Sequence, residues 1–355
     1  MIGELHQNKN SDRHTYIIDD SKNVSDTLKR LQTKYEEEKI SSEELFGKEP
    51  TDLAISNCSI NGRDLNTISE ILSTLQTVSF SDCFFLDFDN DDLQPAPKRI
   101  RTSASPIDLY KRSESTNPIK FRFEKIILSN LKFNTFWDFR NFLEIFFVNT
   151  EINELTFSKQ DDNQTKSGKM QLEEKQSKTG KMQKQNAYEQ QDQENNDYFL
   201  KILEENNHLK KLNKLELQGI HLTDNHAELI ANNLYSSDLN YVDLSRNNIG
   251  DFGLISFSNN INVITNNLES LILDNNDIGD LGVYNLAYSI RHNEKLRRLS
   301  LNNNHSLSQE AISLLHSTND KPRRQTFMFG PYNKKVIIHA SVDRKQRQKH
   351  IKQKT

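Results

Sequence analysis

Cysteine is scarce in this chain, whose 355 residues include only Cys58 and Cys83. A disulfide-rich secreted scaffold is therefore excluded, and no CxxC pair or Cys/His spacing typical of a zinc site occurs. No apolar run approaches the roughly eighteen residues that suggest a membrane span, and the first sixteen residues lack the apolar core of a signal peptide. With 34% hydrophobic residues, the composition predicts a soluble intracellular protein, in the nucleus or the cytoplasm, with part of the chain unpacked.

The sequence also lacks the common motifs of catalysis. Neither HExxH nor GxSxG occurs, and neither does the phosphate-binding pattern GxGxxG or GxxxxGK[ST]. The ten histidines are scattered along the chain. We therefore expect no enzyme activity, no catalytic residue, no bound metal and no cofactor.

The net charge is only −4, but it is unevenly distributed. Residues 321–355 hold eleven Lys and Arg against one acid, Asp343, so the remainder of the chain is acidic. A basic end on an acidic body is typical of an interaction tail. The sequence RKQRQKHIKQK within it has cations but no aromatics, which suits phosphate backbones, an anionic surface or simple solvation.

A repeat is the most informative feature that the sequence does contain. The pattern LxxLxLxxN, with Val for one Leu in its first copy, begins at Leu239, Leu268 and Leu296, at intervals of 29 and 28 residues. Its ninth position is asparagine in all three copies: Asn247, Asn276 and Asn304. This period and pattern are typical of a leucine-rich repeat solenoid. Such a fold presents a long surface of stacked strands, which favours binding over catalysis.

Weaker copies of the pattern extend the repeat toward the N-terminus. They begin at Pro50, Leu75, Phe123, Ile152 and Leu212, and the first two carry Cys58 and Cys83 at the ninth position, where cysteine replaces asparagine in this class. Apolar residues at helical spacing lie between the cores, including an aromatic set over 136–147. The sequence thus predicts an α/β fold: a leucine-rich repeat horseshoe of about eight strand–helix repeats.

Three segments are predicted along the chain. Residues 49–320 form the solenoid, with disordered insertions at 87–120 and 159–197, where polar low-complexity sequence lengthens the period. Residues 1–48 form an N-terminal helical segment with its helix over 25–39, which either caps the first repeat or stands free. Residues 321–355 form a C-terminal cap, with a β-prone run over 336–339, followed by the basic tail.

Two stretches carry a family resemblance. LNYVDLSRNNIGDFG at 239–253 and LESLILDNNDIGDLG at 268–282 resemble the ribonuclease-inhibitor-like class of leucine-rich repeats. The resemblance implies the horseshoe fold but does not specify a function. It does not name a partner, because that class ranges from nuclease inhibitors to Ran GTPase-activating proteins and actin-capping proteins.

The recurring polar residues are predicted to serve the fold. An asparagine at the ninth position points inward and bonds the backbone of the turn, as a buried amide requires. Cys58 and Cys83 are expected to do the same more weakly as free thiols, with a redox pair as the alternative. The glycines of the repeated GDxG sequence are interpreted as turns and helix starts.

The solvent-facing strand positions are the predicted partner-binding site on the concave face. Tyr and Arg are favoured at binding hot spots, and the candidate set is Glu216, Tyr241, Asp243, Arg246, Asp274, Arg297 and Arg298. Lys98, Arg99 and Arg101, in PAPKRIR, form a candidate nuclear localisation signal.

The leading functional hypothesis is a non-enzymatic protein–protein interaction scaffold or adaptor. One alternative is a subunit of a nuclear nucleic-acid-associated complex, anchored by the basic tail. Another is a small-GTPase regulator resembling the Ran GTPase-activating proteins. That family typically carries an acidic C-terminal region, whereas this chain ends in basic sequence.

Overall fold

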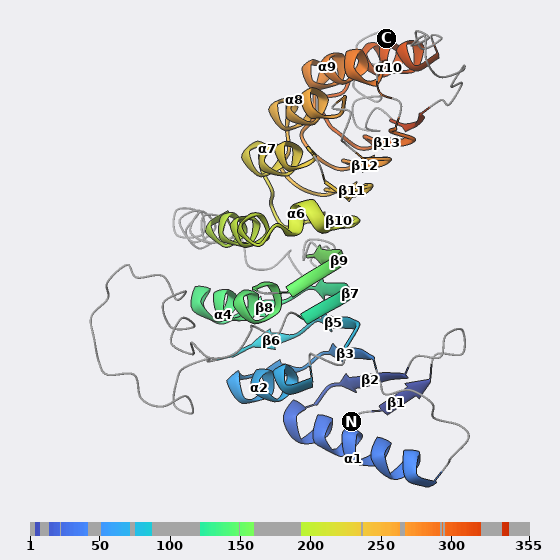
Figure 1. Ribbon diagram of the computed structural model, residues 1–355. Helices are drawn as coiled ribbons and strands as arrows, with labels where there is room; N and C mark the ends of the chain where they lie inside the picture. Colours follow the sequence, from blue (N-terminus) through green and yellow to red (C-terminus); the bar gives the residue numbers. More distant parts are fainter. Residues whose placement is uncertain are drawn as a thin grey trace, which may run out of the picture. The chain divides into compact units, whose positions relative to one another are not determined.

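The protein is described by a computed structural model (Figure 1). The described residues are 4–7, 14–21, 23–41, 51–71, 75–86, 121–148, 150–159, 193–235, 237–262, 267–291, 293, 295–320 and 336–340. The chain is α/β with mostly parallel strands, and it divides into two compact units. Unit 1 comprises Met1–Gln76, Asp82–Arg122 and Lys132–Glu151; unit 2 comprises Thr77–Ser81, Phe123–Leu131 and Ile152–Thr355. Within the described residues, no helix has both the length and the apolar composition that a membrane span requires.

Unit 1 contains two groups of strands. In the first, β1 (Glu4–Gln7) runs antiparallel to β2 (His14–Asp19), which runs parallel to β3 (Asp52–Ser56). In the second, three two-residue strands pair in parallel: β4 (Ser59–Ile60), β6 (Phe84–Phe85) and β8 (Lys132–Phe133). The helices are α1 (Val24–Ser41), α2 (Gly62–Ile71) and α4 (Phe136–Phe147).

The helix predicted over 25–39 is confirmed as α1, but the strands β1 and β2 before it were not predicted. Leu28 and Leu31 are buried on the inner face of α1. The Ser25 amide and hydroxyl donate hydrogen bonds of 2.9 and 2.7 Å to Asp64 Oδ1 on α2. Residues 14–41 thus have the strand-then-helix form of the repeats that follow, and α1 is fastened to α2.

Aromatic packing joins β6, β8 and α4 of unit 1. The rings of Phe85 and Phe133 stack at 4.8 Å, and Phe142 of α4 meets Phe85 edge-on at 4.9 Å. Helix α4 begins with a capping box in which the Asp138 amide donates to Thr135 Oγ1 and the Thr135 amide donates to Asp138 Oδ2. The aromatic helix predicted over 136–147 is confirmed.

Unit 2 is a run of parallel strands with helices beside them. The strands are β5 (Thr77–Ser81), β7 (Phe121–Ser129), β9 (Thr150–Ser158), β10 (Lys214–Gln218), β11 (Tyr241–Asp243), β12 (Ser270–Ile272), β13 (Arg298–Ser300) and β14 (Ile337–His339). Helical residues 193–205 precede α6 (His208–Lys211), α7 (Asp224–Asn233), α8 (Asp251–Asn260), α9 (Asp280–Ile290) and α10 (Gln309–Asp320). Figure 1 shows α7 to α10 stacked side by side along one side of β10 to β13.

Each of the eight predicted strand cores is a strand, from β3 to β13, and the architecture is repeat-like. The insertion predicted at 159–197 needs a correction, because residues 193–197 are already helical. Asn196 and Phe199 of that helix are buried, so this stretch packs despite its polar composition. The insertion predicted at 87–120, the basic cluster inside it and the tail from 341 onward lie outside the described residues.

The asparagines at the ninth position link three repeats of unit 2, those of β11, β12 and β13, each to the repeat before it. Asn247 Oδ1 accepts hydrogen bonds from the amides of Ile220 and Leu222, both 3.1 Å long, and its Nδ2 donates to the Leu217 carbonyl at 2.7 Å. In unit 1, Cys58 Sγ lies 3.0 Å from the Ser56 carbonyl and Cys83 Sγ lies 3.5 Å from the Ile55 carbonyl. Neither cysteine is in a disulfide, and both are buried. The structural reading of these positions is confirmed.

A second set of links joins the starts of neighbouring helices, and the sequence did not predict it. Asp224 Oδ1, on α7, accepts from the amides of Gly250 and Gly253 at the start of α8, at 2.6 and 3.0 Å. Asp251 Oδ1 accepts in the same way from Gly279 and Gly282, at 2.8 and 2.9 Å. The glycines are indeed helix starts, and a Cβ on Gly253 would lie only 2.8 Å from the Asp224 carboxylate. The repeated GDxG sequence therefore encodes a capping contact between consecutive repeats.

Candidate functional site: the polar strand face of unit 2

The polar strand face of unit 2 consists of the side chains that alternate with core residues along its strands. On β10, Leu215 and Leu217 are fully buried, while Lys214, Glu216 and Gln218 occupy the alternate positions. Pairing in register aligns the face into rows across the strands. One row is Lys214, Tyr241, Ser270 and Arg298; the next is Glu216, Asp243, Ile272 and Ser300.

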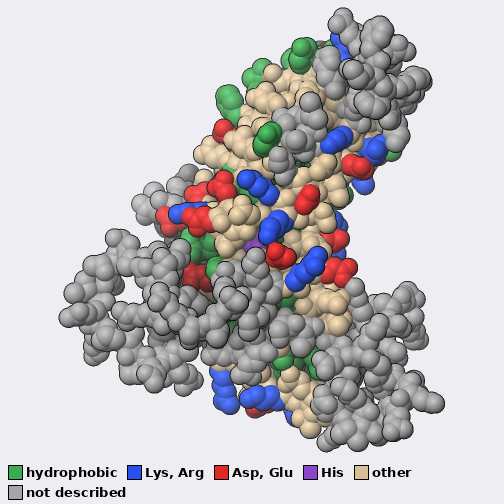
Figure 2. Space-filling model, viewed as in Figure 1, with side chains coloured by type: hydrophobic (Ala, Val, Ile, Leu, Met, Phe, Trp, Pro, Cys, Tyr) green, Lys and Arg blue, Asp and Glu red, His purple; other side chains and the backbone are tan. Residues whose placement is uncertain are grey.

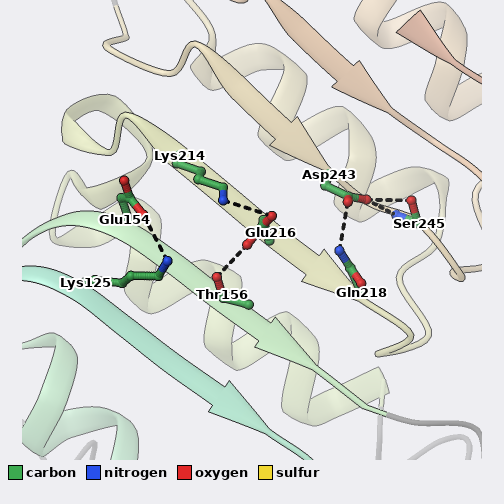
Figure 3. A network of polar contacts seen from close by, with 8 residues as sticks. All are labelled: Lys125, Glu154, Thr156, Lys214, Glu216, Gln218, Asp243 and Ser245. Atoms are coloured by element: carbon green, nitrogen blue, oxygen red, sulfur yellow. Dashed lines mark hydrogen bonds and ion pairs between the residues drawn. The ribbon is translucent and has the colours of Figure 1, made fainter. Parts of the chain in front are cut away.

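Opposite charges are interspersed on this face. Lys125 Nζ lies 3.3 Å from Glu154 Oε2, and Lys214 Nζ lies 3.1 Å from Glu216 Oε1. Glu216 also accepts a 2.7 Å hydrogen bond from the Thr156 hydroxyl, which links β9 to β10 (Figure 3). Figure 2 shows cationic and acidic side chains mixed over the region of β10 to β13. Each acid in Figure 3 has an internal donor, so these carboxylates are largely satisfied by the fold.

Tyr241 is half-buried on β11, and its ring lies under the Lys214 ammonium, 5.0 Å from the ring centre. This is a cation–π contact between adjacent strands. Burial raises the pKa of the Tyr241 phenol, the carboxylates of Asp243 and Glu216 raise it further, and the Arg298 charge lowers it. The phenol therefore remains a protonated hydrogen-bond donor at neutral pH.

Asp243 was predicted to face solvent, and this is wrong, because the residue is only 6% exposed. Its Oδ1 accepts from the Ser245 amide at 2.9 Å and hydroxyl at 2.5 Å, while its Oδ2 accepts from Gln218 Nε2 at 2.8 Å (Figure 3). Burial raises the pKa of Asp243 despite the two bonds from Ser245. Asp243 therefore anchors the face internally and is not a free contact residue.

Arg246 has a left-handed backbone, with φ of 60°. The eighth position is also left-handed in six of the seven other repeats, where it is filled by residues suited to that conformation: Asn57, Asp82, Asn130, Gly219, Asn275 and Asn303. An arginine there is an outlier of the kind that costs of order 1 kcal/mol and clusters at functional sites. Its Nη2 donates to Gln218 Oε1 at 2.9 Å, and its side chain is exposed.

The remaining predicted residues lie next to β12 and on or next to β13. Asp274 Oδ1 accepts from the Ser300 hydroxyl and the Asn302 amide, both at 2.7 Å, so it too is tied to the fold. Arg297 is paired with Glu269 at 3.1 Å, and both side chains are well exposed. Arg298 is exposed, and no ion pair joins its guanidinium to a carboxylate within the described residues.

Ser270 was missed by the sequence analysis. It is 8% exposed, and its Oγ is buried without a hydrogen-bond partner. A serine at a strand position carries no signal in the sequence. Only the register, which places Ser270 between Tyr241 and Arg298, makes it conspicuous.

Comparison with known proteins does not assign the chain to a family. It matches no protein-family model, and no curated protein matches its sequence significantly. Among the described residues, no three His, Cys, Asp or Glu side chains are grouped closely enough to hold a metal ion.

The structure brings most of the predicted site together. Lys214 contacts both Glu216 and Tyr241, and Gln218 bonds both Asp243 and Arg246. Arg298 lies two strands from Tyr241 in the same row. Arg297 lies just before β13 and is held by Glu269. The face thus separates into acids that the fold satisfies and two arginines, Arg246 and Arg298, that have no carboxylate partner among the described residues.

Proposed function

We propose that this chain is a leucine-rich repeat protein that binds a protein partner on the polar strand face of unit 2, the face that is concave in a horseshoe, without catalysing a reaction. The observation that supports this most is a difference between the acids and the arginines of this face. Asp243 and Asp274 accept hydrogen bonds from internal donors, whereas the guanidinium groups of Arg246 and Arg298 have no carboxylate partner among the described residues. Such a face offers rigidly supported donors to an incoming surface.

The composition and breadth of the face favour a macromolecule over a small ligand. Strands lie about 4.8 Å apart, so the row from Lys214 to Arg298 spans four strands and roughly 15 Å of backbone. Tyr241 adds a rigid ring of the type enriched at interface hot spots. The strain of holding an arginine at the left-handed position of Arg246 is also consistent with a residue retained for contact.

The proposal predicts that a Tyr241→Ala, Arg246→Glu double change abolishes capture of the partner by the tagged full-length chain. It removes the ring and reverses an exposed charge, so binding should drop while the thermal midpoint stays nearly unchanged. Capture from extracts of the source cell, followed by mass spectrometry, is the measurement.

A matched control separates the face from the rest of the surface. Tyr235 and Lys210 are exposed in the loop after α7 and on α6, so Tyr235→Ala, Lys210→Glu makes the same chemical changes elsewhere. The control should capture the same proteins as the wild type. Undiminished capture by the Tyr241→Ala, Arg246→Glu variant would reject the assignment, and partners lost on nuclease treatment would favour the nucleic-acid alternative instead.

A further inference from the structure

Three side chains on neighbouring strands form a row of hydrogen-bond donors on the polar strand face. Tyr241 of β11 and Arg298 of β13 are both in register with Ser270 of β12, which lies between them. Leu271 next to Ser270 is fully buried in the core, so alternation puts the serine on the polar face. The backbones of the outer strands are about 10 Å apart, a gap that tyrosine and arginine side chains can close above a serine.

The Ser270 hydroxyl is the unusual member of this row. It is buried, its residue is 8% exposed, and its Oγ has no hydrogen-bond partner. Native proteins leave few buried polar atoms unpaired, since each costs about 1–3 kcal/mol. An unpaired hydroxyl on the strand between those of Tyr241 and Arg298 therefore marks a position where a group from outside the chain supplies the missing acceptor.

The charge pattern around the row identifies the acceptor. Arg298 has no carboxylate partner within the described residues, and its charge acts on the Tyr241 phenol across the intervening strand. Tyr241, Ser270 and Arg298 together thus offer one positive charge and two neutral hydroxyl donors. An anionic oxygen ligand satisfies all three at once, and charge-assisted bonds of this kind are the strongest that such donors form.

Neighbouring acids limit how much negative charge the site accepts. The carboxylates of Glu216 and Asp243 already act on Tyr241, and both belong to the adjacent row. A phosphate, with close to two charges at neutral pH, is repelled more strongly there than a singly charged carboxylate. The surroundings therefore favour a carboxylate.

We propose that Tyr241, Ser270 and Arg298 form a subsite that binds an aspartate or glutamate side chain of the partner protein, with Ser270 as its buried donor. This assignment rests on the proposed function and makes it specific, because it requires an acidic segment in the partner. Arg298 provides the charge and the two hydroxyls fix the orientation of the carboxylate.

The test uses the full chain and fluorescent peptides of defined charge. An acidic probe, acetyl-(Gly-Glu)4, is compared by fluorescence anisotropy with its neutral counterpart, acetyl-(Gly-Gln)4, and with a phosphoserine version, acetyl-(Gly-pSer)4. Low ionic strength is used because salt screens exposed charges. We expect saturable binding of the glutamate peptide, weaker binding of the phosphoserine peptide and none of the glutamine peptide.

Three variants then assign the subsite atom by atom. Arg298→Gln should weaken binding of the glutamate peptide at least about tenfold, and Tyr241→Phe and Ser270→Ala by about three- to tenfold each, in line with hydrogen bonds to a charged group. Tyr241→Phe retains the ring beside Lys214. Ser270→Ala should not lower the thermal midpoint, since the hydroxyl it removes is unpaired in the free protein. The matched controls, Lys210→Gln and Ser313→Ala, change exposed residues of α6 and α10.

The outcomes separate this assignment from the proposed function. Absence of binding to the glutamate peptide, or binding that Ser270→Ala and Arg298→Gln leave unchanged, overturns the subsite even if the Tyr241→Ala, Arg246→Glu variant still loses its cellular partner. Tighter binding of the phosphoserine peptide overturns the carboxylate assignment. Peptide binding that depends on Tyr241, Ser270 and Arg298, together with unaltered capture of partners by the double variant, would show a carboxylate site that the captured partners do not use, which overturns both the proposed subsite and the proposed function.

Discussion

Asp243 illustrates how a side chain on a strand face can serve the fold. It shares the row of Glu216 and alternates with buried Val242, yet three donors from Gln218 and Ser245 close around it. The buried carboxylate is costly when ionised, which is why its pKa is raised above the ordinary 3.8. Burying this carboxylate lowers stability but fixes the position of Gln218, whose Oε1 accepts a hydrogen bond from Arg246.

This burial predicts a pH dependence of folding that Asp243→Asn removes. The folded chain holds the Asp243 proton more tightly than the unfolded chain does, so the stabilisation is fully present below pH 3.8. It is lost as pH rises through the folded pKa. We therefore expect the stability of the wild type relative to Asp243→Asn to fall as the pH rises above about 3.8.

Chemical denaturation at a series of pH values measures this difference. Asp238→Asn is the control, because Asp238 is exposed and the change removes a carboxylate of ordinary surroundings. A stability difference between the wild type and Asp243→Asn that stays constant across the series would contradict the linkage.

At the scale of the element, the repeats that contain β10 to β13 are joined to their neighbours at both ends of the strand–helix unit. The ninth-position asparagine bonds the turn of the preceding repeat, as Asn276 does with the Ile249 amide and the Leu244 carbonyl. The aspartate at each helix start caps the next helix, as Asp224 does for α8. A carboxylate is well placed there, because it satisfies amides that the helix leaves unpaired and lies at its positive end.

Asp224→Ala is predicted to weaken the start of α8 rather than α7, in whose first turn Asp224 itself lies. Both the Gly250 and Gly253 amides lose their acceptor, so the free energy of unfolding should fall by about 1–2 kcal/mol. Amide hydrogen exchange should quicken most at residues 250–254. Asp277→Ala, at an exposed loop position, is the matched control, and protection at 250–254 equal to that of the control would argue against the cap.

The sequence predicted the strands well and the links between repeats only in part. Apolar residues at the repeat spacing located eight strands, β3, β5, β7 and β9 to β13, since a core residue must recur where the strand does, but they did not locate the two-residue strands β4, β6 and β8. The asparagine contacts followed from the need to pair a buried amide. The aspartate caps did not, because a carboxylate in one repeat acts on glycines about 26 residues later, a separation that no local pattern displays.

On the scale of the whole molecule, stability in unit 2 is built from neighbour-to-neighbour contacts. β10 to β14 pair only in sequence order, and α7 to α10 pack on one another in the same order. In such a stack a perturbation is felt mainly by adjacent repeats. The sequence predicted which face holds the site but not the state of its residues. The burial of Asp243 and the unpaired hydroxyl of Ser270 depend on how the strands pack rather than on residue type.

Leu271→Ala tests this organisation. Leu271 is fully buried on β12, so the change should cost about 2–5 kcal/mol. We expect hydrogen exchange to accelerate in β11 to β13 and in α8 and α9, with little change in α4 of unit 1. Leu281→Ala is the control, because Leu281 is 52% exposed on α9. Equal acceleration throughout both units would show a single cooperative fold instead.

The two thiols allow the opening of unit 1 to be measured separately from that of unit 2. The only cysteines of the chain, Cys58 and Cys83, both lie in unit 1. Both are buried and neither is in a disulfide. Burial raises the pKa of the Cys58 thiol. A thiol-specific reagent therefore reaches the two cysteines only when the repeats around them open. Its rate of reaction then reports the opening of unit 1 in the unaltered protein. Unit 2, which contains no cysteine, stays silent in the same experiment.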